Sequence, residues 1–185
     1  MAEIRQELDK VVQRILKKIQ VELSDEFDQN FEREAFFSER WARRKSPVHG
    51  GRSGHLLYDS GVLRGNIRSE IKGSSLFFSS DLPYAGIHNE GGEIVVTERM
   101  KRFFWAKCRA ANGGGWPRRR NGGNGSNAEA EFWKMMALKK VGTAIHIPQR
   151  RFLGVNAEVE QIVKDIGEEG LSEYFENEYE FKIKD

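Results

Sequence analysis

The sequence predicts an α+β fold: a small antiparallel sheet with a long N-terminal helix, a C-terminal helix and a helical insertion. Residues 3–32 and 156–175 place apolar side chains three or four positions apart, as amphipathic helices do. Residues 71–80, 91–96 and 143–147 contain short β-type runs bounded by Gly or Pro. The order helix, helix, strand, strand, helix pair, strand, helix is that of an α+β protein, and we expect the strands to pair antiparallel.

The N-terminal helix carries one apolar stripe, formed by Ile4, Leu8, Val11, Val12, Ile15, Leu16, Ile19, Leu23, Phe27 and Phe31. A stripe of about seven turns is about 40 Å long, which exceeds what a small sheet covers. We therefore expect the half from Ile4 to Ile19 to lie partly outside the body and to bury its stripe against another copy or another partner. Packing on the protein's own sheet is the alternative.

The middle of the chain alternates between loops and short elements. Residues 38–55 are basic and Gly-rich, so we expect a loop anchored by Trp41. Residues 56–67 predict a short helix capped by Asp59 or Ser60, with Gly61 permitting close packing.

Two further helices are expected within residues 97–142. The first begins at the Thr97-Glu98 pair and turns Met100, Phe103, Phe104 and Cys108 inward; the second spans residues 129–141. Residues 112–127 between them are rich in Gly and Asn and bury too little apolar surface to offset ordering, which predicts a flexible loop. We interpret residues 1–185 as a single domain and 97–142 as an insertion in it.

Charge is unevenly distributed, although the formal net charge is only +2. Residues 98–120 contain eight Lys or Arg and one acid, whereas residues 156–185 contain ten acids and three Lys. This asymmetry suits head-to-tail contacts between copies or a basic surface patch, and both interpretations remain open.

Composition restricts the compartment. Cys108 is the single cysteine, which excludes an internal disulfide and favours a reducing compartment. The charged N-terminus lacks an apolar core, so we expect no signal peptide, and no segment approaches the roughly 18 apolar residues of a membrane span. We expect a soluble protein made inside the cell, with no membrane partner.

No pattern indicates catalysis, a cofactor or a metal. The four histidines, at positions 49, 55, 88 and 146, do not show the spacing of a zinc site, and Ser60 lacks the context of a nucleophile elbow. His88 and Glu90 are two positions apart and would point to different faces of a helix. We therefore assign no catalytic, metal or cofactor residue.

The segment PYAGIHNEGG, residues 83–92, predicts a structural corner. Pro83 ends a strand, Tyr84 and Ile87 pack one side of a single helical turn, and Gly91 or Gly92 provides the left-handed cap. Ala85 and Gly86 keep the turn close to the sheet. His88 and Glu90 are then surface or hydrogen-bonding residues.

Three short motifs follow one another along the chain: Ser60-Gly61-x-Leu63, Pro83-Tyr84-Ala85-x-x-His88-x-x-Gly91 and Pro148-x-x-x-Phe152-Leu153-Gly154. In this order they resemble the phage virion morphogenesis family, the tail-completion proteins of Mu-like and similar tailed phages and of prophages. The resemblance covers roughly residues 25–175, apart from 97–142. Arg151 stands where the family usually has Pro, which leaves the chemistry of that turn open.

The resemblance implies a non-enzymatic protein that completes the tail or joins head and tail during assembly. It implies rings or other homo-oligomers, contacts with phage tail or connector proteins, and a location in the bacterial cytoplasm and then in the virion.

A second function class is a nucleic-acid-binding module. Its contacts would come from the basic loops, through Arg43, Arg44, Arg118, Arg119 and Arg120. Steep salt dependence of DNA affinity would favour it.

Overall fold

The computed structural model describes residues 2–44, 55–113 and 128–183, and their side chains from residue 5 to residue 176 outside the two gaps. The α+β class is confirmed. Within the described residues the strands form three separate antiparallel pairs, where the sequence predicted a single sheet. The chain divides into unit 1 (Met1–Arg40, Gly61–Pro83 and Arg151–Asp185) and unit 2 (Trp41–Ser60 and Tyr84–Arg150).

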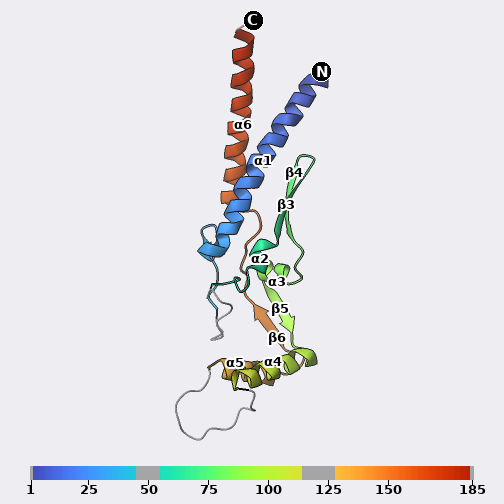
Figure 1. Cartoon of the computed structure of the whole chain (residues 1–185), viewed down its shortest axis with the longest axis vertical. Coiled ribbons are helices and arrows are strands. Elements are labelled where there is room, and N and C mark those ends of the chain that lie inside the picture. Colours follow the sequence, from blue (N-terminus) through green and yellow to red (C-terminus); the bar gives the residue numbers. More distant parts are fainter. Residues whose placement is uncertain (1, 45–54, 114–127, 184–185) are drawn as a thin grey trace. The chain divides into compact units, whose positions relative to one another are not determined.

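Two long helices form the frame of unit 1. Helix α1 spans Ala2–Arg33 and helix α6 spans Ala157–Ile183, and they run side by side in opposite directions (Figure 1). They approach closely at Gly170, where an added Cβ would lie 2.5 Å from Cγ1 of Ile15. Lys18 of α1 pairs with Glu173 of α6 at 3.2 Å. The missing side chain at position 170 thus lets the two helices pack.

This pairing corrects the expectation for the N-terminal half of α1. Val11 and Ile19 are buried, and Ile15 packs against the core of unit 1. The physical reason is that α6 lies against this half of α1, with Gly170 next to Ile15 and Glu173 paired with Lys18. Among the side chains of this half that the structure describes, from residue 5 onward, the large apolar ones that are exposed are Leu8 and Val12.

A β-hairpin packs beside α1. Strand β3 spans Ile67–Lys72 and strand β4 spans Ser75–Ser80, joined by a two-residue turn at Gly73 and Ser74. The short helix expected within residues 56–67 is present as α2, Val62–Gly65. The sequence predicted a strand only from residue 71, so the start of β3 was missed, although exposed charged residues alternate there with half-buried ones.

The core of unit 1 is aromatic and aliphatic. Phe27 of α1 contacts the rings of Phe36, Phe37 and Phe78 at centroid distances of 6.2, 6.2 and 4.9 Å. Phe36 ends strand β1 (Ala35–Phe36), which pairs with β2 (Glu39–Arg40), a short hairpin that the sequence did not predict. Side chains from three separate segments, one of them α1 itself, thus meet at this ring.

An ion-pair cluster joins α2 to α1. The guanidinium of Arg64 donates to the carboxylates of Asp28 and, at 2.8 Å, of Glu32. The hydrogen bond from Arg64, helped by its positive charge and opposed by partial burial, lowers the pKa of Asp28. These contacts hold the short helix against the long one.

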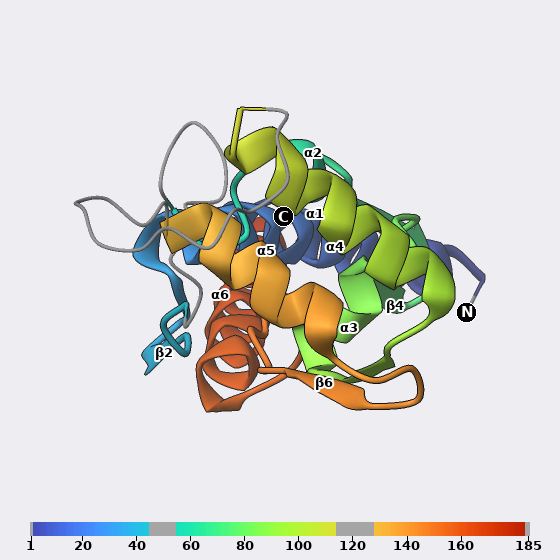
Figure 2. The same ribbon diagram turned by 90° about the horizontal axis from the view of Figure 1, so that it is seen from below.

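Unit 2 contains a two-stranded sheet and a helix pair. Strand β5 (Gly92–Val95) pairs with β6 (Ala144–Ile147), and the short helix α3 spans Ala85–Glu90. Helices α4 (Glu98–Ala111) and α5 (Ala128–Leu138) pack side by side (Figure 2). These strands and helices were predicted, although the second helix ends before residue 141.

The ring stack between α4 and α5 corrects one detail. Phe104 stacks on Trp133, and Cys108 donates its thiol to the carbonyl of Ala130, so these faces point inward as expected. Phe103, also predicted to point inward, is exposed. Phe103 precedes Phe104 by one residue and therefore lies about 100° around the helix from it, past the edge of the buried face. Whether residues 97–142 are an insertion stays a prediction.

Two loop predictions are resolved in part. Trp41 is buried, as expected of an anchor, whereas residues 45–54 lie outside the described residues, as do residues 114–127 of the Gly-rich segment. None of the helices in the described ranges is long and apolar enough to span a membrane.

The aromatic core predicts the effect of truncating Phe27, which is 2% exposed. Phe27→Ala should lower the free energy of unfolding by about 3–5 kcal/mol, because it removes the ring and leaves a cavity. Val21→Ala, on the same helix but 66% exposed, is the matched control and should change it by less than about 0.5 kcal/mol. Urea denaturation followed by circular dichroism measures both. Equal losses for the two variants would contradict this description of the core.

Candidate functional site

The first motif lies at the start of α2. Gly61 is the N-cap residue, with φ of 78°, and no side chain caps the helix. The expected cap by Asp59 or Ser60 was therefore wrong: Ser60 is exposed, and the positive φ at Gly61 sets the turn. Leu63 is buried.

The second motif forms the corner between Pro83 and Gly91. The helical turn is present as α3, with Ala85 buried, but Tyr84 is exposed, and its ring lies edge-on to that of His88 at a centroid distance of 6.2 Å. No atom lies within 4 Å of a Cβ built on Gly86, so that residue is not required for close packing. Tyr84 and Gly86 therefore do not have the packing roles predicted for them.

Gly91 is the C-cap residue of α3 and has a positive φ as the sequence predicted, although its ψ of −175° is not that of the left-handed helical conformation. Its φ is +73°, and a Cβ there would lie 2.8 Å from the backbone N of Gln149. Beside it, the carbonyl of His88 accepts a hydrogen bond of 2.8 Å from the backbone N–H of Arg150. The end of α3 is thus joined, backbone to backbone, to the segment that follows β6.

His88 is half-buried beside this junction. Its Nδ1 is buried and has no hydrogen-bond partner, while Glu90 is exposed. Burial of the ring, and then the positive charge of Arg150, lower the pKa of His88 below its ordinary 6.5. Arg150 is itself positioned by a hydrogen bond of 3.1 Å from its Nε to the carbonyl of Ala42. The arrangement favours a neutral imidazole.

The third motif begins with Pro148, which lies in unit 2 after β6, and continues into unit 1. Phe152 is buried against Phe31, with ring centroids 5.3 Å apart, and Leu153 packs on the core of unit 1. Arg151, which stands where the resemblance predicts Pro, lies over the ring of Phe36 at 4.8 Å. It also donates to the carbonyl of Val155 at 3.0 Å, and its side chain covers Gly154.

Asn30 is a residue of this region that the sequence interpretation missed. It is 0% exposed. Its Oδ1 accepts from the backbone N–H of Phe37 at 2.9 Å, and its Nδ2 donates to the carbonyl of Phe152 at 3.4 Å. The sequence did contain a signal: Asn30 is a polar residue next to Phe27 and Phe31 of the apolar stripe. A polar side chain buried at such a position is normally hydrogen-bonded, which could have suggested a structural role for Asn30.

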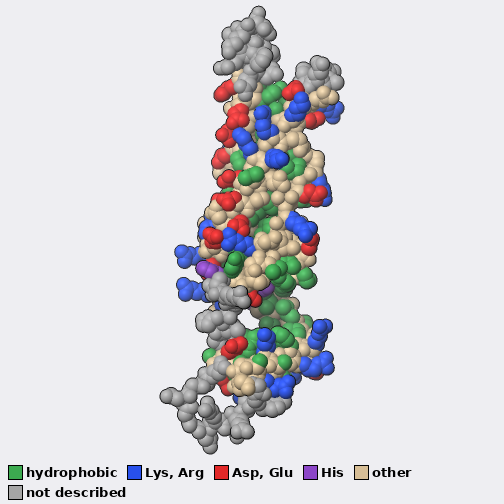
Figure 3. All heavy atoms as spheres, viewed as in Figure 1, with side chains coloured by type: hydrophobic (Ala, Val, Ile, Leu, Met, Phe, Trp, Pro, Cys, Tyr) green, Lys and Arg blue, Asp and Glu red, His purple; other side chains and the backbone are tan. Residues whose placement is uncertain are grey.

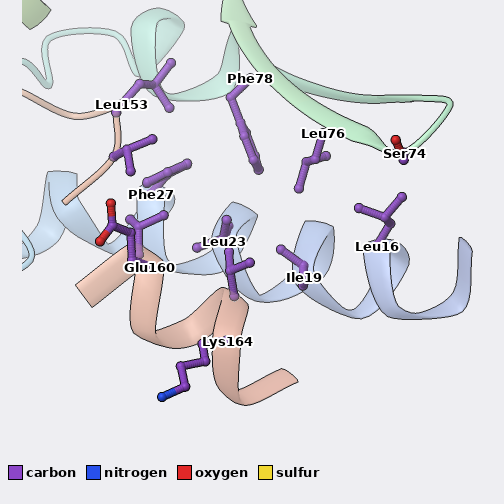
Figure 4. Close-up of a pocket in the computed structure, with 14 residues that line it drawn as sticks. Leu16, Ile19, Leu23, Phe27, Ser74, Leu76, Phe78, Leu153, Glu160 and Lys164 are labelled. Atoms are coloured by element: carbon purple, nitrogen blue, oxygen red, sulfur yellow. The ribbon is translucent and has the colours of Figure 1, made fainter. Parts of the chain in front are cut away.

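An open apolar groove of about 680 Å³ lies within unit 1. Figure 4 shows Leu76 and Phe78 of β4 pointing toward Leu23 and Phe27 of α1, with Lys164 pointing away from them. We call this surface the apolar groove, and it is lined by Leu16, Ile19, Leu23, Phe27, Ser74, Leu76, Phe78, Leu153, Gly154, Val155, Val159, Glu160, Val163 and Lys164. The last motif therefore forms part of its wall.

Arg43 and Arg44 line a second groove, of about 990 Å³, within unit 2. We call it the basic groove. Its lining includes Arg43, Arg44, Phe132, Met135, Ile145 and Arg150. The other three predicted contact residues, Arg118, Arg119 and Arg120, lie outside the described residues. Within the described ranges no group of three or more His, Cys, Asp or Glu side chains is placed to hold a metal ion.

Comparison with protein families tests the resemblance that the three motifs suggested. The model of the phage virion morphogenesis family matches residues 2–172, which is most of the chain. The chain belongs to this family. No curated protein and no solved structure matches it. The match includes all three motifs and both grooves, and it supports a role in phage assembly.

The geometry at Gly91 predicts that Gly91→Val destabilises the protein. A β-branched side chain is strained at positive φ and would also collide with the backbone at Gln149, which should cost roughly 1–3 kcal/mol or more. Gly86→Ala, in the same short helix, is the matched control and should be neutral or slightly stabilising. Thermal unfolding of both variants checks the prediction; a Gly91→Val protein as stable as wild type would contradict it.

The surroundings of His88 predict a pH dependence. The pKa of His88 is lower in the folded than in the unfolded protein, so the unfolded state binds more protons as the pH falls below about 6.5. Stability is then lost as the pH falls toward the folded-state pKa. His88→Gln should lose less stability than wild type between pH 7.5 and 5.0 in urea denaturation. Equal losses would show that His88 does not contribute to this dependence.

Proposed function

We propose that this member of the phage virion morphogenesis family is a non-enzymatic structural protein that completes the tail or joins head and tail. It would act as an assembly of several copies in contact with tail or connector proteins, in the bacterial cytoplasm and then in the virion. Family membership supports the coarse role. The apolar groove is the single observation that supports the finer one.

The apolar groove has the properties of a protein-binding surface. Ten of its lining residues are Leu, Ile, Val or Phe, and two of them, Val155 and Val163, are largely exposed. Apolar surface open to water is favourably buried by a partner. Charged groups are restricted to Glu160 and Lys164 among the lining residues, so the groove suits an apolar segment of another protein.

The function is tested by deleting the gene in a phage or prophage that carries it and examining the particles by electron microscopy. We expect separate heads and incomplete tails, restored to whole virions by the wild-type gene. Val155→Asp with Val163→Asp should keep the fold but fail to restore virions, because two carboxylates would enter the apolar groove. Val141→Asp is the control: this valine is also exposed but belongs to unit 2, outside the apolar groove, and the variant should restore whole virions.

Whole virions from the deletion strain would refute the proposal. If the purified protein then bound DNA with steep salt dependence that Arg43→Ala and Arg44→Ala removed, the nucleic-acid alternative would replace it.

A further inference from the structure

The outer face of α6 is both apolar and acidic. Leu171 and Phe175, one turn apart, are 43% and 56% exposed, on the side of the helix away from Gly170 and α1. Glu168 and Glu176 flank them and are exposed. Figure 3 shows acidic side chains gathered along this helix. We call the surface formed by these four residues the acidic face. Two exposed apolar side chains beside carboxylates are typical of a helix that binds in a groove.

The basic groove has the complementary chemistry. Its floor is formed by side chains from α5 and β6, and two of them, Met135 and Met136, can adapt their shape to a partner. Of the lining residues that the structure describes, three are arginines and only Glu131 is acidic. Arg43 is exposed and Met135 is 56% exposed, so both the charged rim and the apolar floor are accessible.

We propose that the basic groove of one copy binds the acidic face of α6 of a second copy. Leu171 and Phe175 pack on the methionines and Phe132, and the carboxylates of Glu168 and Glu176 approach the arginines. The apolar contacts supply most of the stability, while the charges set the orientation and exclude other partners.

Other occupants match only half of this surface. A nucleic acid would neutralise the arginines but would leave Phe132, Met135 and Ile145 without apolar partners. The segment 114–127 of the same chain contains Arg118, Arg119 and Arg120, which the arginines of the groove would repel. The acidic face of α6 provides both the apolar side chains and the negative charge.

The contact joins two different surfaces, one from each unit. A pair of copies therefore keeps one free groove and one free acidic face, and further copies can add until a ring closes. This inference rests on the proposed function, since it specifies the contact through which copies of the assembly protein associate.

Charge reversal tests the contact with the full-length protein. The groove variant carries Arg43→Glu and Arg44→Glu, and the face variant carries Glu168→Lys and Glu176→Lys. Each alone should raise the dissociation constant for self-association at least about tenfold in sedimentation velocity. The two variants mixed in equal amounts should associate again, because the wild-type groove of one meets the wild-type face of the other, and the reversed groove meets the reversed face. All four changes in one chain should restore association.

The control reverses charge elsewhere in unit 2. Arg99→Glu with Arg102→Glu alters two exposed arginines of α4 outside the groove and should leave association unchanged. Circular dichroism melting confirms that each variant is folded. Because all the altered charges except that of Arg44 are on exposed side chains, loss of folding is not expected, and a groove variant of Arg43→Glu alone covers the case in which Arg44 is structural.

Several outcomes would overturn the inference. They are a wild-type protein that stays monomeric at high concentration, variants that associate like wild type, a mixture of the two variants that stays monomeric, or a groove variant that loses DNA binding but still associates.

Phage complementation separates the two proposals. If the variants associate normally while the deletion strain still lacks whole virions, the inference fails and the assembly function stands. If the deletion strain makes whole virions, the assembly function fails.

Discussion

Unit 1 depends on a single buried amide. Asn30 is fully enclosed, and its side chain hydrogen-bonds the backbone of Phe37 and of Phe152. Leaving a buried donor or acceptor without a partner costs about 1–3 kcal/mol, so helix α1, the turn after β1 and the third family motif are held in one arrangement. Apolar contacts around Phe27 stabilise many similar packings, whereas a directional amide restricts unit 1 to one of them.

The hydrogen bond from Asn30 to Phe152 also determines the wall of the apolar groove. Once Phe152 is fixed against α1, Leu153 lies at one end of the groove, and α6 begins shortly after it at Ala157. Helix α6 then returns along α1 and can approach closely because residue 170 is glycine. The Arg151 guanidinium packs over the ring of Phe36 and donates a hydrogen bond to the carbonyl of Val155, and these contacts hold the turn before α6.

Local patterns in the sequence predicted the elements whose side chains follow one period. The stripe of α1, the helix pair α4 and α5, and the strands β5 and β6 all do so. The start of strand β3 was missed because only Ile67 and Ile71 of its inward positions are apolar, with Ser69 between them. The role of Asn30 and both grooves could not be predicted, because each brings together residues far apart in the chain, such as Leu16 and Phe78 or Arg43 and Met135. Local sequence patterns do not indicate which distant residues come into contact.

The acidic end of the sequence takes on a structural meaning when each unit is considered by itself, although the arginines of the basic groove lie outside the basic segment 98–120. The acidic side chains of α6 belong to unit 1, and the arginines of the basic groove belong to unit 2. Charges at these exposed sites act over about 8 Å at physiological ionic strength, so they influence a partner only when it is nearly in contact. They can therefore select the register of a docking helix but cannot hold it alone. Persistent association requires the apolar side chains beside them, and Leu171, Phe175 and the methionines of the groove are placed for that purpose. A surface that combines both kinds of contact binds selectively and can still release a wrongly placed copy, which suits stepwise assembly of a particle.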